Sequence, residues 1–293
     1  MQGRALRVPA TADILGLFLS ITHERGESLS IWELIGYTRR LIRGRRAELL
    51  LVCLPPIAAG LLFRLGEAAF FSMLLYFGAM RPAELFSGSF AGQLVLAAVL
   101  TLLRWGVTAP LICAAAVKLR SAVTDGAEDV TVSEMLLRGS FIIRSITAYA
   151  AGRLLCFAAL VPTALLGAYA YTLVADGGVG SELFTAWNAA ALAVLSAFLW
   201  LGARLSVTAV PFLLAEYPER GGLSCVLLSL SFMRGRKRFP LGLAAVYLLP
   251  LATVVGIPVF LPEAAAAFAT GISIFIKEDE YARSAVRRVR RTG

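Results

Sequence analysis

The sequence predicts an all-α protein, a polytopic transmembrane helical bundle of about six spans with cytoplasmic amphipathic surface helices and internal hairpin repeats. The chain of 293 residues is 58% hydrophobic and only 16% charged, whereas soluble domains average about 25% charged residues. Several apolar runs approach the roughly 20 residues that cross a bilayer core. Basic residues gather between these runs, which is typical of a membrane surface, so we expect no nucleic-acid partner.

The N-terminal region, residues 1–46, is expected to lie in the cytoplasm and to carry an amphipathic helix. Ser30-Ile31-Trp32-Glu33 has the hydroxyl-x-x-carboxylate pattern that satisfies free amides at a helix start. Behind it, apolar residues recur near helical spacing while Arg39, Arg40 and Arg43 fall between them. The apolar stretch of residues 14–21 is not followed by a small-x-small cleavage site, so we expect no cleaved signal peptide.

A membrane domain is expected over residues 47–277, followed by a basic cytoplasmic tail at 278–293. Its spans are predicted at about 47–78, 91–117, 146–175, 184–214, 240–261 and 262–277. The first run leaves two alternatives open, because residues 47–80 can form one span or a span that ends near Phe63 and a separate interfacial helix from 68. Only Leu261-Pro262-Glu263 separates the last two spans.

The distribution of positive charge predicts the orientation. Of the 28 Lys and Arg residues, 23 lie in four segments, namely residues 1–46, 116–145, 217–239 and the tail from Lys277. The opposite loops, at 79–90, 176–183 and 262–265, contain only Arg81. The positive-inside rule therefore predicts a multi-pass protein of the cell membrane with both termini in the cytoplasm. Its expected partners are the lipid bilayer and the anionic lipids of the cytoplasmic face.

Several segments recur along the chain and predict three related hairpins, each introduced by a surface helix. Thr131-Val132-Ser133-Glu134 repeats the capping pattern before the third span, and Ser224 can cap a third surface helix. Arg43-Gly44-Arg45-Arg46 opens the first span, and Arg234-Gly235-Arg236-Lys237 opens the fifth. Three copies that all start inside the cell could pack about an axis normal to the membrane.

Residues 204–239 carry a resemblance to a known family. They read Pro-Phe-Leu-Leu-Ala-Glu-Tyr-Pro, then Gly-Gly, then Ser-Leu-Ser-Phe-Met-Arg-Gly-Arg-Lys. This pattern resembles the signature of a bacterial integral membrane family, domain-of-unknown-function family 975. The matching positions are Ala215, Glu216, Pro218, Ser229, Met233 and Gly235. Glu216 stands where that family has Asp, Tyr217 stands where it has Asn, and its Trp after the glycine is missing. The resemblance implies a six-span layout and brings no established activity.

Charged residues inside the apolar runs are the candidate polar sites. Arg64 and Glu67 are three residues apart on one helix face and form a candidate structural pair. Arg104 and Arg204 lie in matching Arg-x-x-Val-Thr-Ala contexts and form a candidate intramembrane polar site for an anionic substrate or lipid headgroup. The alternative is that both snorkel to the inner interface or bind carbonyls that Pro110 and Pro211 leave free.

The residue inventory argues against enzymatic chemistry. The chain has one histidine, and its four cysteines lack metal-ligand spacing, so we expect no metal, cofactor or catalytic residue. The sequence favours a non-enzymatic component of the cytoplasmic membrane that handles lipids or organises a partner protein. The alternative is a transporter or export permease subunit for an anionic or amphipathic substrate. An ATP-driven version would need a separate ATPase, because the chain has no Gly-x-x-x-x-Gly-Lys loop.

Overall fold

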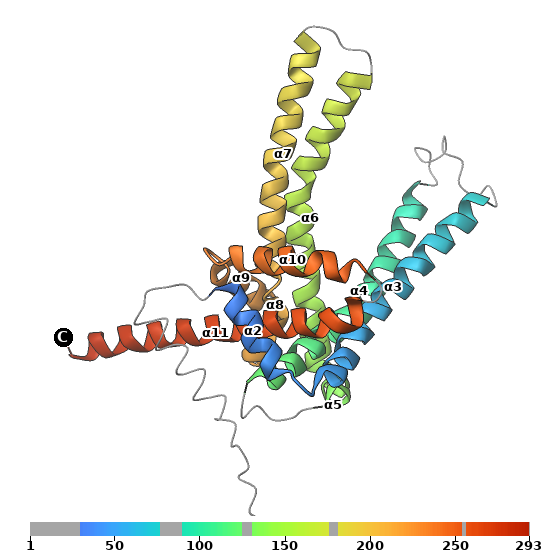
Figure 1. The fold of residues 1–293 in the computed structure, drawn as a ribbon. Coiled ribbons are helices and arrows are strands. Elements are labelled where there is room, and N and C mark those ends of the chain that lie inside the picture. The colour runs from blue at the N-terminus through green and yellow to red at the C-terminus, as the bar shows by residue number, and fades with distance from the viewer. Residues whose placement is uncertain (1–29, 77–89, 125–130, 176–180, 254–255, 293) are drawn as a thin grey trace, which may run out of the picture. The chain divides into compact units, whose positions relative to one another are not determined.

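A computed structural model describes residues 30–76, 90–124, 131–175, 181–253 and 256–292 (Figure 1). Every regular element in these ranges is a helix, which confirms the all-α prediction. Among the described residues, five helical segments are long and apolar enough to cross a membrane: Arg46–Phe70, Ala98–Val123, Gly139–Ala175, Ser181–Glu216 and Gly256–Tyr281. This composition is typical of a membrane protein. Residues 1–29 and most of the predicted outer loops at 79–90, with Arg81, and 176–183 lie outside the described residues.

The chain forms two compact units. The first combines Met1–Leu62, Leu111–Leu137 and Phe239–Gly293, and the second combines Phe63–Pro110 and Arg138–Arg238. Two long helices have residues in both units. These are α3 (Arg46–Tyr76) and α4 (Phe90–Val123). Helix α3 continues without a break through Pro55 and Pro56, so its described part is a single helix and not a span with a separate interfacial helix.

The first unit begins with α2 (Ile31–Leu41), whose start confirms the predicted capping box. The Glu33 amide donates to Ser30 Oγ at 3.2 Å, and the Ser30 amide donates to the Glu33 carboxylate at 3.2 Å. The predicted box before the third span is also confirmed, because Thr131 and Glu134 exchange the same two hydrogen bonds at 3.3 Å. The helix behind that second box, α5 (Val132–Leu137), has only 6 residues.

The last two helices correct the predicted boundary between the fifth and sixth spans. Helix α10 (Arg238–Leu251) has 14 residues, and α11 (Gly256–Thr292) runs continuously through Pro262, where a loop was expected. The chain turns instead after Leu251. Thr253 Oγ1 accepts from the Gly256 amide at 2.9 Å and donates to the Pro250 carbonyl at 2.8 Å, so it closes the turn. The prediction was wrong because a helix tolerates Pro262 at the cost of one backbone hydrogen bond.

Helices α10 and α11 run antiparallel to each other, and α2 packs on both of them (Figure 1). Phe239 on α10 contacts the rings of Phe268 and Phe275 on α11, at 5.7 and 5.2 Å between ring centroids. Leu34 and Ile35 of α2 complete the same apolar core. We call α10 and α11 as far as Lys277 the C-terminal hairpin. Protein encloses 61% of the apolar window of α11, a far larger share than in the other long helices.

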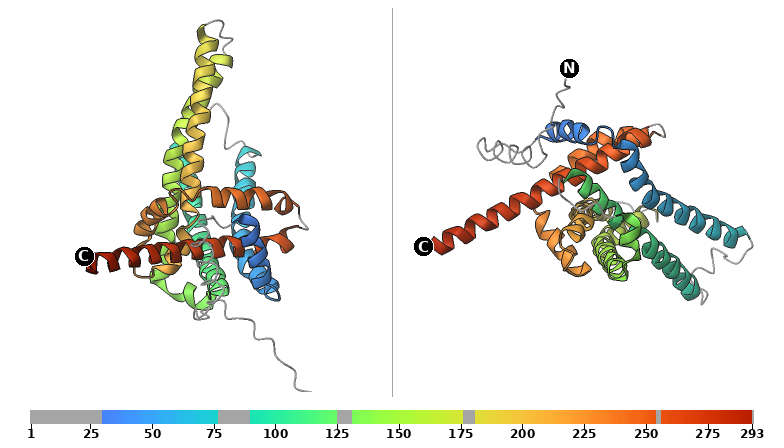
Figure 2. Two further views of the ribbon diagram at one scale, coloured as in Figure 1. Left: turned by 60° about the vertical axis from the view of Figure 1, so that its left-hand side comes forward. Right: turned by 90° about the horizontal axis from the view of Figure 1, so that it is seen from below.

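The second unit is built on α6 (Gly139–Ala175) and α7 (Ser181–Val207), which lie side by side in both views (Figures 1 and 2). They run antiparallel, because Thr163 shares a hydrogen bond of 2.9 Å with Ser196 while Gly152 lies against Val207. Small buried residues on both helices allow this close packing: Ala148, Gly152, Cys156, Ala186, Ala189, Ala193 and Ser196. Only 11% and 6% of their apolar windows are buried, so their outer faces suit lipid.

Helices α8 (Val210–Glu216) and α9 (Gly222–Phe232) pack against α6 and α7 near the ends that lead into basic segments. The prediction of a third surface helix was wrong in two respects. Its cap residue is Gly221 and not Ser224, which lies inside α9. It also carries no charged residue, and Leu223 and Leu227 are exposed on it. Helix α9 is therefore apolar on its outer face and not amphipathic and basic.

The turns that follow α2 and α9 share one backbone conformation. Gly44 has φ 94° and Gly235 has φ 82°, the left-handed region that glycine adopts without steric cost. The residues two positions earlier are Ile42 and Met233, which are both buried and donate their amides to Thr38 and Ser229. The two Arg-Gly-Arg motifs aligned in the sequence therefore fold alike. The short α5 leads into α6 without such a turn, and the repeat of three hairpins stays a prediction.

Candidate functional site

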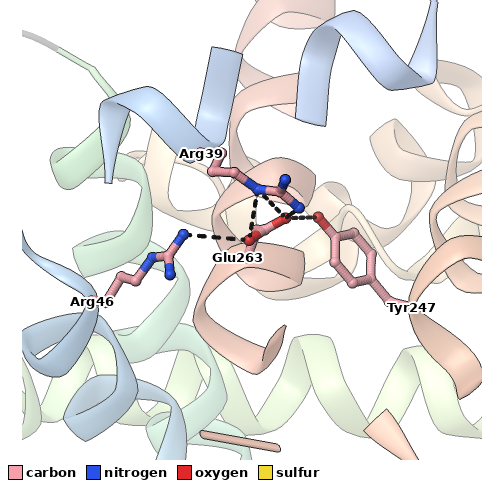
Figure 3. A network of polar contacts seen from close by, with 4 residues as sticks. All are labelled: Arg39, Arg46, Tyr247 and Glu263. Atoms are coloured by element: carbon pink, nitrogen blue, oxygen red, sulfur yellow. Dashed lines mark hydrogen bonds and ion pairs between the residues drawn. The ribbon is translucent and has the colours of Figure 1, made fainter. Parts of the chain in front are cut away.

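A buried carboxylate forms the centre of the first unit (Figure 3). Glu263 lies in α11 directly after Pro262, and its side chain is only 2% exposed. Arg39 on α2 donates to it through Nε at 3.2 Å to each oxygen and through Nη2 at 2.8 Å. The Tyr247 hydroxyl on α10 donates to Glu263 Oε1 at 2.8 Å. The Arg46 guanidinium at the start of α3 lies 3.7 Å from Glu263 Oε2. We call these four residues the Glu263 clamp.

The Glu263 clamp has more positive than negative charge. Two guanidinium groups share one carboxylate, and the hydrogen bonds and charge of Glu263 raise the pKa of Arg39 above its ordinary value. The carboxylate is buried, but the Arg39 and Arg46 side chains are 56% and 44% exposed. Each guanidinium therefore holds Glu263 with one side and presents the other to the surroundings. This arrangement fixes α2 and the start of α3 to the C-terminal hairpin and leaves a net positive surface.

Further polar contacts connect helices of the first unit. The hydroxyls of Thr38 on α2 and Thr270 on α11 lie 3.5 Å apart in the core. Glu48, one turn into α3, pairs with Arg45 at 3.1 Å and with Lys118 of α4 at 3.6 Å. The Glu263 carboxylate already accepts several hydrogen bonds, and in the described ranges no group of three or more His, Cys, Asp or Glu side chains could hold a metal ion. The clamp thus joins helices and exposes two positively charged guanidinium groups.

Sequence reasoning missed Glu263, which was assigned to an outer loop at 262–265. The structure overturns that assignment, because residues 262–265 lie inside the continuous helix α11. The signal that could have found the residue is the cost of an acidic side chain in an apolar run, which requires a basic partner. The partner is 224 residues away in the chain, so spacing alone could not identify it.

A second charged group occupies the second unit and corrects the predicted pairing of Arg64 with Glu67. Arg104 Nη1 on α4 donates to both Glu67 carboxylate oxygens, at 3.0 and 2.7 Å. Both side chains are largely buried, at 19% and 18% exposed. The partner on the neighbouring helix lies closer to the Glu67 carboxylate than Arg64 on the same helix.

The predicted site that joins Arg104 and Arg204 receives no support from these contacts. Arg204 lies near the end of α7 with an exposed side chain, whereas the guanidinium of Arg104 is held by Glu67. Trp105 next to Arg104 contacts the Tyr149 ring edge on, with centroids 6.2 Å apart, and the Tyr149 hydroxyl accepts from Arg153 Nη2 at 2.5 Å.

The positions that resemble the membrane family serve the local structure of the second unit. Ala215 and Glu216 end α8, and Pro218 lies in the exposed turn behind it. Ser229 is buried and donates to the Ser206 carbonyl of α7. Met233 caps α9, and Gly235 supplies the left-handed turn. The segment is also held by Arg144 of α6, which donates to the carbonyls of Tyr217 and Arg220 at 3.1 and 2.9 Å.

No protein-family model, no curated protein and no solved structure matches this chain. The resemblance to domain-of-unknown-function family 975 therefore stays a prediction that rests on the six positions named above.

Proposed function

We propose that this chain is a non-enzymatic component of the cytoplasmic membrane that binds anionic lipid headgroups along α2. The observation that carries the proposal is the outer face of that helix. Trp32 is 70% exposed, Arg39 and Arg40 are exposed as well, and Arg43 is exposed in the turn that follows the helix, while Leu34 and Ile35 are buried. Tryptophan prefers the level of the headgroups, and each surface arginine gains about 1 kcal/mol from anionic lipid.

The Glu263 clamp makes this face a fixed part of the molecule. An isolated helix of 11 residues is marginal in water, so α2 depends on packing for its stability. Burial against the C-terminal hairpin and the ion pair from Arg39 to Glu263 provide that packing. A rigid basic helix at the membrane surface suits a component that gathers anionic lipids or a partner protein.

The same contacts support an orientation with both termini in the cytoplasm. Helix α10 spans about 21 Å at 1.5 Å per residue, and the hydrocarbon core is about 30 Å thick. Both open ends of the C-terminal hairpin adjoin basic segments, and Glu263 on its returning arm contacts Arg39 and Arg46. The hairpin accordingly enters and leaves the membrane from the inner side. Four helical segments then cross: α3, α4, α6 and α7 with α8.

Lipid preference tests the function. The purified full chain is reconstituted in phosphatidylcholine with spin-labelled phosphatidylglycerol, and the relative association constant of the labelled lipid is measured. An Arg40→Gln/Arg43→Gln variant is expected to lower the constant about fivefold per arginine, the equivalent of about 1 kcal/mol each. An Arg40→Lys/Arg43→Lys variant keeps the charge and is expected to keep the preference. Equal constants for wild type and the glutamine variant would refute the proposal.

Maleimide labelling in intact cells tests the orientation. All four native cysteines are buried, so new cysteines stand out against them. The reagent is membrane-impermeant. Gly178→Cys in a predicted outer loop is expected to react in intact cells. Glu219→Cys, which follows α8, is expected to react only after the cells are lysed. Thr253→Cys in the turn of the C-terminal hairpin is expected to stay unlabelled in intact cells. Labelling of Thr253→Cys from outside would overturn the inner-side hairpin.

A transporter or permease subunit for an anionic or amphipathic substrate is the second candidate. The observation that favours it is the pair of arginines within α4 and α6, at Arg104 and Arg153, because charges inside spans often mark substrate pathways. Flux of a labelled anionic amphiphile into liposomes that contain the purified protein separates the two candidates. Robust, substrate-specific flux would contradict the non-transporting component, and lipid retention without flux would count against transport.

A further inference from the structure

Within the second unit, consecutive residues of α4 contact two other helices: Arg104 pairs with Glu67 of α3, and Trp105 contacts Tyr149 of α6, which binds Arg153. We call this set the Arg153 cluster. Glu67 and Arg104 neutralise each other through two hydrogen bonds. The contact between Trp105 and Tyr149 connects α4 with α6. The charge that remains in the cluster is therefore the one on Arg153.

Arg153 has neutral partners on the described part of the chain but no carboxylate. Its Nη2 donates to the Tyr149 hydroxyl, and its guanidinium carbon lies 4.9 Å from the centre of the Tyr149 ring. Its Nε is buried and has no hydrogen-bond partner among the described residues. A guanidinium held in this way inside a spanning helix has an uncompensated charge, which an anion would neutralise.

The depth of Arg153 argues against simple contact with bulk water. Arg144 binds the carbonyls of Tyr217 and Arg220 at the end of the spanning helices. Arg153 lies nine residues further along α6, about 13–14 Å deeper at 1.5 Å per residue. An anion that reaches this depth has to bring an apolar portion with it. Leu103 on α4 and Leu154 and Phe157 on α6 are exposed apolar side chains next to the cluster.

We propose that the Arg153 cluster binds the phosphate group of an anionic amphiphile, with the apolar chains of the ligand along the exposed faces of α4 and α6. Arg153 supplies the positive charge. The Tyr149 hydroxyl accepts from Arg153 and keeps its own hydrogen to donate to a phosphate oxygen. The salt bridge between Glu67 and Arg104 holds α3 and α4 together beside the site and leaves the charge of Arg153 available to the ligand.

Retention of phosphatidylglycerol by the purified full chain, followed by native mass spectrometry in detergent, tests the site. Arg153→Gln is expected to lower retention at least tenfold. Tyr149→Phe, which removes one hydroxyl, is expected to lower it severalfold. Arg204→Gln is the matched control, because Arg204 is an exposed arginine near the end of α7 in the same unit, and it is expected to retain lipid like the wild type. Helix content by circular dichroism shows that each variant is folded.

Inorganic phosphate distinguishes the two sources of the ligand. Millimolar phosphate is expected to leave lipid retention unchanged, because free phosphate lacks the apolar portion. If phosphate displaces the lipid from the wild type and has no such effect on Arg153→Gln, the site binds a phosphate group, but its ligand is the free ion. Equal retention by wild type, Arg153→Gln and Tyr149→Phe overturns the site. All retention measurements are made in the Arg40→Gln/Arg43→Gln background, which keeps Arg153, so that lipid bound along α2 does not contribute and the two proposals fail separately.

Discussion

In the Glu263 clamp the carboxylate is buried and the guanidiniums are exposed, so we expect removal of an arginine and removal of the carboxylate charge to have unequal costs in stability. After Arg39→Ala, the Glu263 carboxylate, which is 2% exposed, has as partners the Tyr247 hydroxyl and the Arg46 guanidinium 3.7 Å away. Removal of one partner from a fully buried pair costs about 3–5 kcal/mol. Arg39 is 56% exposed, so solvent screening places the expected cost lower, at about 2 kcal/mol. In Glu263→Gln the two exposed guanidiniums can turn to water, and the expected cost is under about 1 kcal/mol.

Unfolding of the purified protein in SDS, followed by circular dichroism, measures these costs, and the double variant makes the test strict. In Arg39→Ala/Glu263→Gln the glutamine amide faces space open to water, so the double variant should be no less stable than Arg39→Ala alone. Arg45→Ala at the exposed Arg45–Glu48 pair is the control and should cost at most about 1 kcal/mol. Additive costs, or a Glu263→Gln variant weaker than Arg39→Ala, would refute the clamp reasoning.

Two further pairs of variants test the packing of the second unit by the same SDS unfolding assay. Ser229→Ala removes a buried hydrogen bond and should cost about 1–2 kcal/mol, whereas Ser231→Ala in an exposed position should stay within about 0.5 kcal/mol. A methyl group at Gly222 would lie 2.6 Å from the Ala148 amide nitrogen, so Gly222→Ala should cost about 1–3 kcal/mol. Gly167→Ala in α6 meets nothing within 4 Å and should be neutral or stabilising. A reversed order within either pair would contradict the packing described.

The parts of the fold that depend on neighbouring residues were predictable. Both capping boxes form as expected, since a hydroxyl and a carboxylate three residues apart satisfy amides of the same turn. The exposed arginines and buried leucine and isoleucine of α2 follow from helical spacing in the same way. The matching turns at Gly44 and Gly235 also follow from a short motif, because a left-handed residue between two arginines favours glycine.

The parts that depend on distant residues were not predictable from spacing. Pro262 was expected to end a helix, but α11 runs through it and buries the next residue against α2 and α10. Glu67 was expected to pair within its helix, but the Arg104 guanidinium 37 residues away reaches it. In both cases an acidic side chain inside an apolar run takes the partner that tertiary structure brings nearest, and no local rule specifies that partner.

The Glu263 clamp also sets an order of events during synthesis. Arg39 leaves the ribosome 224 residues before Glu263, which corresponds to roughly 11–45 s at about 5–20 residues per second. Throughout that interval the apolar side of α2 has no hairpin to cover it, and the nearest apolar phase is the membrane itself. The buried face of α2 is thus completed only when the C-terminal hairpin has been made.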